Sequence, residues 1–258
     1  MLSAGEIVGR SFSLYRRFFP KLWAVSGGFA VPLGLLLFSA LRLLNDKVYV
    51  TRDPLTRRFD DLHCVGPCGP TVRQLIFTGL LAILLLLLQT ATLTRATMRA
   101  GTGLPVSIED SVWFGARRAF HVLIVTIVYS AVVAAGFFAL FVPGLVFAFR
   151  FFLAVPAMLV EGMGPLRALG RSWSLTKGES WHTLGALLLL WFVAGIPENL
   201  VARLASHLTI GSFTLLIIVA YAFASPLQQL GSSVLYLDLR CREGGAGVHA
   251  QLVEQLSR

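Results

Sequence analysis

Two stretches of this chain carry no charged residue over the length of a membrane span. The first covers residues 75–94 and includes the run LLAILLLLLQTATL, and the second covers residues 213–236. An α-helix rises about 1.5 Å per residue, so about 20 apolar residues cross the hydrocarbon layer of a bilayer. Helices satisfy their backbone hydrogen bonds internally, which hydrocarbon requires. These stretches therefore predict an all-α integral membrane protein.

The composition agrees with this class. Hydrophobic residues make up 56% of the chain and charged residues only 14%, whereas about a quarter of the residues in soluble domains are charged. The formal net charge is +9. In a membrane protein this excess sets loop orientation and attracts anionic headgroups. We therefore expect membrane lipids as the main partners, other membrane proteins as a second class of partner, and no nucleic-acid partner.

The apolar runs and their polar boundaries predict six transmembrane helices in a single membrane domain. The expected elements are an interfacial helix at 1–21, a span at 22–44, an outer loop at 45–72, a span at 73–99, an interfacial helix at 105–120, spans at 121–142 and 143–161, an interfacial helix at 164–178, spans at 180–200 and 211–237, and a cytoplasmic tail at 238–258.

The distribution of Lys and Arg predicts the orientation. With both termini in the cytoplasm, the inner segments hold more Lys and Arg than the outer segments, as the positive-inside rule requires. Most of the outer ones lie in the single loop 45–72. We expect a multi-pass protein of the inner (cytoplasmic) membrane.

A sequence motif near the start of the chain recurs near its middle. GRSFSLYRRFF occupies residues 9–19 and GRSWSLTKGES occupies residues 170–180; a fainter copy, SIEDSVWFGARRAF, occupies residues 107–120. At helical spacing each copy separates apolar from basic residues, which is typical of helices in the membrane interface. Ser3 and Glu6 fit a capping box that starts the first copy. Since each copy precedes two spans, we expect three repeats of an interfacial helix and a helical hairpin.

The basic residues of these copies are the predicted contacts to lipid headgroups. They are Arg10, Arg16, Arg17, Arg117, Arg118, Arg167, Arg171 and Lys177.

The chain resembles a family of bacterial six-helix membrane proteins, related to the membrane domain fused to some glycerophosphoryl diester phosphodiesterases. GEIVGRSFSLYRRFF at the start carries the resemblance, together with residues 141–162, residues 164–178 and LYLDLRCREGG at 235–245. The loop 45–72 departs from it, being longer and richer in charge. The resemblance implies an all-helical membrane domain whose function is largely unassigned. It does not imply phosphodiesterase activity, which belongs to a separate soluble domain.

Catalytic and metal-binding patterns are missing from the sequence. It contains no HExxH and no GxSxG motif, and no Asp or Glu lies in the middle of a predicted span. We therefore expect no enzymatic activity, no catalytic residue, no cofactor and no metal.

Arg150 is the one ionised residue near the middle of a predicted span. Because an arginine at mid-depth costs at least about 2.5 kcal/mol, it is usually paired or faces a cavity. Two hypotheses remain for Arg150. Its side chain either pairs with Glu161, Asp238 or backbone carbonyls in a structural role, or it contacts a ligand. The neutral residues Gln89, Gln228 and Gln229 are expected to form hydrogen bonds between helices.

The outer loop contains Cys64 and Cys68 in HCVGPCGP. Three alternatives stand for this pair: a disulfide across a small loop in an oxidising space, two free thiols, or a metal site completed by His63 and Asp60.

These features predict a non-catalytic membrane protein that organises lipids or partner proteins at its basic cytoplasmic face. The alternative is a transporter or flippase for an amphiphilic anion, with Arg150 as the counter-charge.

Overall fold

The computed structural model describes residues 3–45, 72–177, 180–205, 210–244, 251–254 and 256. Its helices are α1 (Ala4–Asn45), α2 (Val72–Gly101), α3 (Ile108–Ala139), α4 (Phe141–Arg150), α5 (Ala154–Glu161), α6 (Pro165–Thr176), α7 (Ser180–Ala205) and α8 (Ile210–Gly244). The described ranges contain helices, turns and short connections but no strand. The predicted all-α fold is confirmed.

Five helical segments are long and apolar enough to cross a membrane. They are Ala4–Leu41, Arg73–Gly101, Ile108–Ala139, Phe141–Glu161 and Gly211–Glu243. In α7 the apolar stretch Thr183–Val193 is shorter. The chain is therefore a multi-pass membrane protein with five candidate spans by length and composition.

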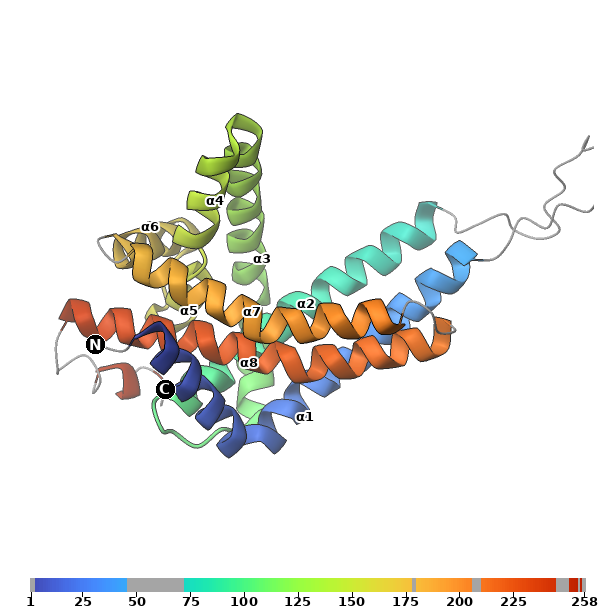
Figure 1. Ribbon diagram of the computed structural model, residues 1–258, viewed down its shortest axis with the longest axis horizontal. Helices are drawn as coiled ribbons and strands as arrows, with labels where there is room; N and C mark the ends of the chain where they lie inside the picture. Colours follow the sequence, from blue (N-terminus) through green and yellow to red (C-terminus); the bar gives the residue numbers. More distant parts are fainter. Residues whose placement is uncertain are drawn as a thin grey trace, which may run out of the picture.

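Helices α1 and α3 each join a predicted interfacial segment to the span that follows it. α1 runs for 42 residues with Pro20 and Pro32 inside it, and α3 runs for 32 residues. Figure 1 shows α1 changing direction in its first half, and a proline permits such a bend because it removes one backbone hydrogen bond. The interfacial and spanning parts of these units are thus continuous helix.

Hydrogen bonds at the start of α1 confirm the predicted capping box. The Ser3 amide donates to the Glu6 carboxylate at 2.5 Å, and the Glu6 amide donates to the Ser3 hydroxyl at 3.2 Å. Ser107 caps α3 in a similar way, accepting from the Asp110 amide at 3.4 Å. Both caps satisfy amides that have no partner inside the helix.

The fourth apolar segment is interrupted immediately after Arg150. α4 ends there, residues 151–153 form a turn, and α5 begins at Ala154. At the other end of α4, Gly136 and Gly144 let α3 and α4 approach closely, because a Cβ on Gly136 would lie 2.8 Å from the Gly144 Cα. Small residues commonly permit such close crossings between membrane helices.

The largest hydrophobic core lies where α1 begins and α8 ends, at one end of the molecule (Figure 1). Ile7, Leu153, Leu175 and Tyr236 pack together there. Leu252 and Leu256, from the segment predicted as a tail, are each only 1% exposed in the same core. This end is therefore packed by side chains from α1, α2, α5, α6, α7 and α8 and from the segment after α8.

Other parts of the helices leave large apolar side chains uncovered. Phe138 and Phe141, at the turn of the α3–α4 hairpin, are 94% and 71% exposed. In Figure 1 this hairpin points away from the long direction shared by α7 and α8. Such surfaces fit a hydrocarbon surrounding, where apolar exposure has no cost.

A line of polar contacts joins α2 to α8. Gln89 donates to the Ser225 hydroxyl at 3.3 Å, Gln229 donates to the Thr94 hydroxyl at 3.0 Å, and the Thr97 and Ser233 hydroxyls lie 2.7 Å apart. The pairs are 136, 135 and 136 positions apart in sequence. Since this separation is nearly constant, α2 and α8 run parallel. The interhelical hydrogen bonds predicted for Gln89 and Gln229 are confirmed.

Replacing Gly115 by Ala should destabilise the protein. A Cβ there would lie 2.4 Å from the Thr92 hydroxyl oxygen and 3.1 Å from the Thr92 amide nitrogen. We expect a loss of about 1–3 kcal/mol from overpacking, measured as a lower unfolding temperature in detergent.

Gly28→Ala in α1 is the matched control, because a Cβ at Gly28 meets no atom within 4 Å. This change should be neutral or stabilise by up to about 1 kcal/mol through helix propensity. Equal effects of the two substitutions would contradict the close α2–α3 crossing.

Candidate functional site

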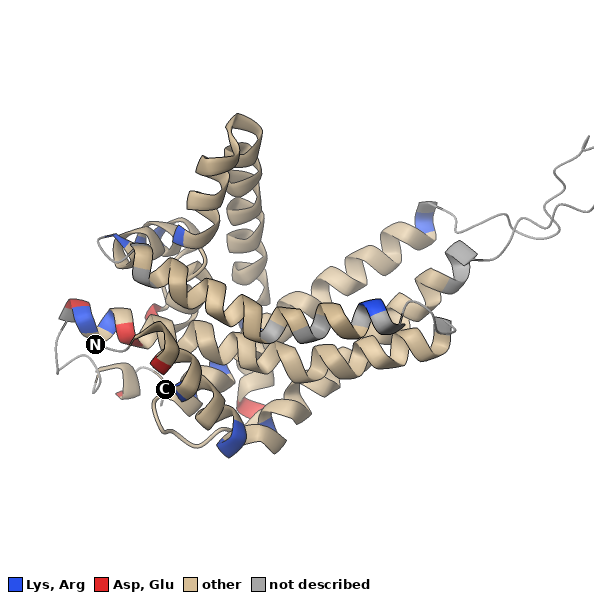
Figure 2. Ribbon diagram, in the orientation of Figure 1, with Lys and Arg blue, Asp and Glu red and all other residues tan. Residues whose placement is uncertain are grey.

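Most of the predicted headgroup contacts are exposed basic side chains. Those with exposed side chains are Arg10, Arg16, Arg17, Arg117, Arg167 and Lys177, while Arg118 and Arg171 are partly buried. In Figure 2 most of the blue segments gather toward the end of the molecule where α1 begins and α8 ends. The predicted residues thus lie mainly at one basic end.

Aromatic rings lie beside several of these arginines. The Arg117 guanidinium is 4.8 Å from the centre of the Trp113 ring, and that of Arg17 is 5.6 Å from the Phe18 ring. Trp113 and Phe12 are 61% and 51% exposed. Exposed aromatic rings next to arginines are typical of the boundary between hydrocarbon and headgroups.

Arg171 is held by two carboxylates. Its Nε donates to both Glu161 oxygens, at 3.1 and 3.2 Å, and its Nη1 donates to Glu243 Oε1 at 2.8 Å. Its Nη2 also pairs with Glu243. Hydrogen bonding to Glu243 raises the pKa of Arg171 above its ordinary value, with Glu161 adding to the effect against the cost of burial. Arg171 is therefore a fixed cation that links α6 to the ends of α5 and α8.

A second arginine and a tyrosine complete this group. Arg240 Nε lies 3.3 Å from Glu161 Oε1 and its Nη1 lies 3.3 Å from Glu243 Oε2, while the Tyr236 hydroxyl donates to Glu161 at 2.8 Å. The Glu161 side chain is only 11% exposed. We call these five residues (Glu161, Arg171, Tyr236, Arg240 and Glu243) the Glu161 clasp. Its two cations balance its two carboxylates, so burial leaves no net charge unpaired.

Arg150 stacks on a ring of α6. Its guanidinium lies 4.2 Å from the centre of the Trp173 ring, and its backbone carbonyl accepts a hydrogen bond from the Ser172 hydroxyl at 2.6 Å. Of the acids considered as partners, Glu161 belongs to the clasp and Asp238 pairs with Arg242 at 2.8 Å. α6 therefore packs directly against the interruption between α4 and α5.

A second cluster of arginines lies where α2 meets the start of α3. Arg95, which is 8% exposed, lies 4.4 Å from the Phe114 ring centre. Arg118 approaches the same ring at 5.8 Å, and Arg99 lies 3.6 Å from Asp110. Only the packing of α2 on α3 brings Arg95 and Arg99 together with Arg118.

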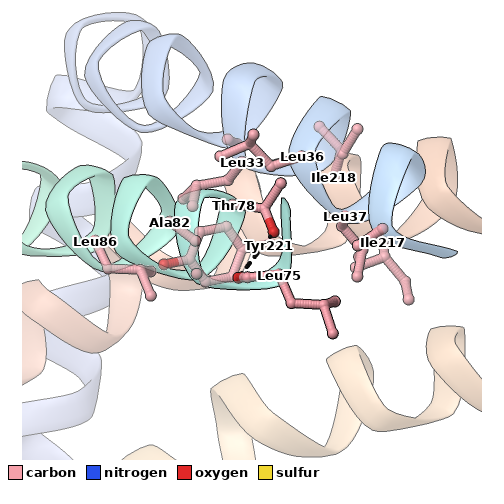
Figure 3. Close-up of a pocket in the computed structure, with 14 residues that line it drawn as sticks. Leu33, Leu36, Leu37, Leu75, Thr78, Ala82, Leu86, Ile217, Ile218 and Tyr221 are labelled. Atoms are coloured by element: carbon pink, nitrogen blue, oxygen red, sulfur yellow. Dashed lines mark hydrogen bonds between the residues drawn. The ribbon is translucent and has the colours of Figure 1, made fainter. Parts of the chain in front are cut away.

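An apolar crevice opens between α1, α2 and α8 (Figure 3). It has a volume of about 410 Å³ and is lined almost entirely by aliphatic side chains, among them Leu33, Leu37, Ala82 and Ile218. Thr78 turns its hydroxyl to the Leu75 carbonyl of its own helix, at 3.1 Å. The crevice therefore offers apolar contact and few hydrogen-bonding groups.

Two smaller cavities lie beside the interrupted fourth segment, with volumes of about 280 and 260 Å³. Tyr129 and Phe152 line both of them. Arg150 is not among the described residues that line either cavity.

Cys64, Cys68, His63 and Asp60 lie outside the described residues, so the three alternatives for the outer-loop cysteines stay open. Within the part of the chain that the structure covers, no three His, Cys, Asp or Glu side chains gather in a way that could hold a metal ion.

Residues 71–237 match the family described as "Domain of unknown function (DUF7847)". The chain belongs to the DUF7847 family. No curated protein and no solved structure matches it significantly.

The DUF7847 match begins just before α2 and ends inside α8. Arg95, Arg150, Glu161 and Arg171 lie within it, whereas α1 and Glu243 lie outside. The Glu161 clasp therefore combines residues of the DUF7847 region with the end of α8. Glu161 and Glu243 are 82 positions apart, and no local sequence pattern could have paired them through Arg171.

Replacing Arg171 by Gln should destabilise the protein. It removes one of two cations from Glu161, and a mostly buried carboxylate that loses a charged hydrogen bond costs about 1.5–3 kcal/mol. The unfolding temperature in detergent measures this loss.

Arg167→Gln is the matched control, since Arg167 lies one turn earlier on α6 and is exposed. We expect its effect to stay within about 0.5 kcal/mol. If both variants unfold at the same temperature as the wild type, the clasp contributes nothing to stability.

Proposed function

We propose that this DUF7847 protein is a non-catalytic, multi-pass protein of the cytoplasmic membrane that organises lipids or partner proteins at its basic end. The observation that carries the proposal is the exposed Arg117 guanidinium 4.8 Å from the centre of the exposed Trp113 ring, at the end of the molecule where the exposed arginines Arg10, Arg16 and Arg17 also lie. Arginine attracts anionic headgroups, and the rings anchor the same surface at the membrane boundary.

The relation to the membrane domain of glycerophosphoryl diester phosphodiesterases is part of this proposal. The helical fold is compatible with it, and we expect no phosphodiesterase activity from the chain.

We propose six spans, with α7 as the fifth. Two parallel spans need an odd number of crossings between them. α2 and α8 run parallel, and the candidate crossings between them are α3, the α4–α5 segment and α7, since α6 is a short helix of 12 residues. A crossing by α7 satisfies this count although its apolar stretch Thr183–Val193 is short.

The packing of α1 on α8 supports termini on one side. Ser26 contacts Ser225 at 2.7 Å, and further along α1 a Cβ on Gly34 would meet Ile218, which lies earlier in α8. The two helices therefore run antiparallel, so α1 starts on the side where α8 ends. The positive-inside rule makes this side the cytoplasm.

The burial pattern supports the proposed threefold repeat. The serines that align in the three copies, Ser11, Ser111 and Ser172, are each fully buried. The residues four positions later, Tyr15, Gly115 and Thr176, are buried as well. Each copy thus turns the same side of its helix toward the protein.

The transporter alternative has weaker support. It needs a polar cavity that reaches Arg150, but the guanidinium rests on Trp173 and neither neighbouring cavity has Arg150 among its described lining residues. We therefore favour a structural role for Arg150.

Cysteine labelling tests the crossing of α7. In a background with Cys64, Cys68 and Cys241 replaced by Ser, Trp181→Cys and Arg203→Cys place a thiol at either end of α7. An impermeant maleimide added to intact cells should label Arg203→Cys and leave Trp181→Cys unlabelled until the cells are opened. Labelling of both or neither position in intact cells would contradict the six-span topology.

The lipid role is tested by replacing Arg10, Arg16, Arg17 and Arg167 together by Gln. Each basic residue near an anionic surface contributes about 1 kcal/mol, so the protein should retain several-fold less phosphatidylglycerol on purification in mild detergent. Quantitative lipid analysis of the purified protein measures this ratio against phosphatidylethanolamine.

Arg73→Gln with Arg203→Gln is the control, because these residues lie in the first turn of α2 and the last turn of α7, at the other end of the proposed topology. An equal loss of phosphatidylglycerol in both sets of variants would contradict a lipid-organising role of the basic end.

A further inference from the structure

Arg95 is a buried cation without a hydrogen-bond acceptor among the described residues. It is 8% exposed, its Nε is buried without a partner, and its guanidinium lies 4.4 Å from the centre of the Phe114 ring. A guanidinium has five N–H donors, and burying them unpaired costs several kcal/mol. A π contact compensates for only part of this cost.

The surroundings of Arg95 increase the positive charge instead of neutralising it. Arg99 lies one turn further along α2, and its Nε is also buried without an acceptor. Arg118, on α3, approaches the Phe114 ring at 5.8 Å. The nearby acid is Asp110, whose side chain is 64% exposed and lies 3.6 Å from Arg99. Three cations therefore face one exposed carboxylate.

We infer that Arg95, Arg99 and Arg118 form a binding site for the phosphate of an anionic phospholipid. Guanidinium groups bind phosphate through paired N–H donors, and a phosphate would supply the acceptors that Arg95 and Arg99 lack. This inference rests on the proposed function, because it assigns a lipid to one place at the basic end.

The location of the cluster favours a lipid over a soluble phosphate. Arg95 lies six residues before the end of α2 and Arg118 lies in α3, both within candidate spans. Trp113, next to Phe114 on α3, is 61% exposed. A phosphate here would sit at the depth of the headgroups, with apolar helix surface below it for the acyl chains.

Ligand-dependent stabilisation tests the site. The full-length protein in maltoside detergent is titrated with dioctanoyl phosphatidylglycerol, and separately with inorganic phosphate, while its unfolding temperature is followed. We expect phosphatidylglycerol to raise the unfolding temperature, and Arg95→Met to bind it at least about tenfold more weakly. Arg118→Gln removes a partly exposed cation and serves as the second variant if Arg95→Met does not fold. We expect Arg118→Gln to bind phosphatidylglycerol more weakly as well.

Arg73→Met is the matched control, since Arg73 is exposed in the first turn of α2, at the opposite end of the helix that carries Arg95. If both ligands raise the unfolding temperature and the rise depends on Arg95, the site is supported and phosphate alone is a sufficient ligand. If phosphatidylglycerol raises the unfolding temperature and inorganic phosphate does not, the site is supported as a lipid site. No rise with either ligand, or an equal rise in the wild type, Arg95→Met and Arg118→Gln, overturns the inference.

The Gln variant of Arg10, Arg16, Arg17 and Arg167 separates this site from the broader proposal. It should keep the Arg95-dependent rise even where it loses co-purified phosphatidylglycerol. If the variant keeps its co-purified phosphatidylglycerol while the Arg95-dependent rise in unfolding temperature is present, the proposed function is contradicted and the binding site is still supported.

Discussion

Backbone groups inside a hydrocarbon layer must find partners within the protein, and the interrupted fourth segment depends on this constraint. α4 ends at Arg150 and α5 starts four residues later, which frees carbonyls that a continuous helix would bond. The Phe151 carbonyl accepts from the Ala154 amide, and the Arg150 carbonyl accepts from the Ser172 hydroxyl. Since Ser172 belongs to α6, the interruption and the short helix α6 stabilise each other.

The position of α6 then organises the charges around it. Its Trp173 covers the Arg150 guanidinium, and its Arg171 reaches the carboxylates of Glu161 and Glu243. The two arginines of this region therefore have aromatic and carboxylate partners within the protein. Arg95 is buried more deeply than either of them, at 8% exposed, and its guanidinium lies against the Phe114 ring.

The Glu161 clasp and the Arg95 cluster differ in how much of their charge is neutralised within the protein. The two arginines of the Glu161 clasp neutralise its two carboxylates, so the clasp is suited to hold helices together. The exposed arginines and the Arg95 cluster keep their charge available for an anionic partner. The lipid-organising role that we propose would use both, because a fixed surface holds its cations in place for a headgroup.

The sequence by itself determined the all-α class of fold, the positions of the apolar stretches, the capping box at Ser3 and Glu6, and the exposure of most basic side chains in the interfacial segments. These follow from local periodicity and from the chemistry of single residues. Only the tertiary structure decided that Arg171 faces carboxylates, that Arg150 stacks on Trp173, and that Arg95 shares a ring with Arg118. Those outcomes depend on which helices become neighbours. Hydrophobic periodicity shows that a helix has an apolar side but does not specify which helix will pack against it.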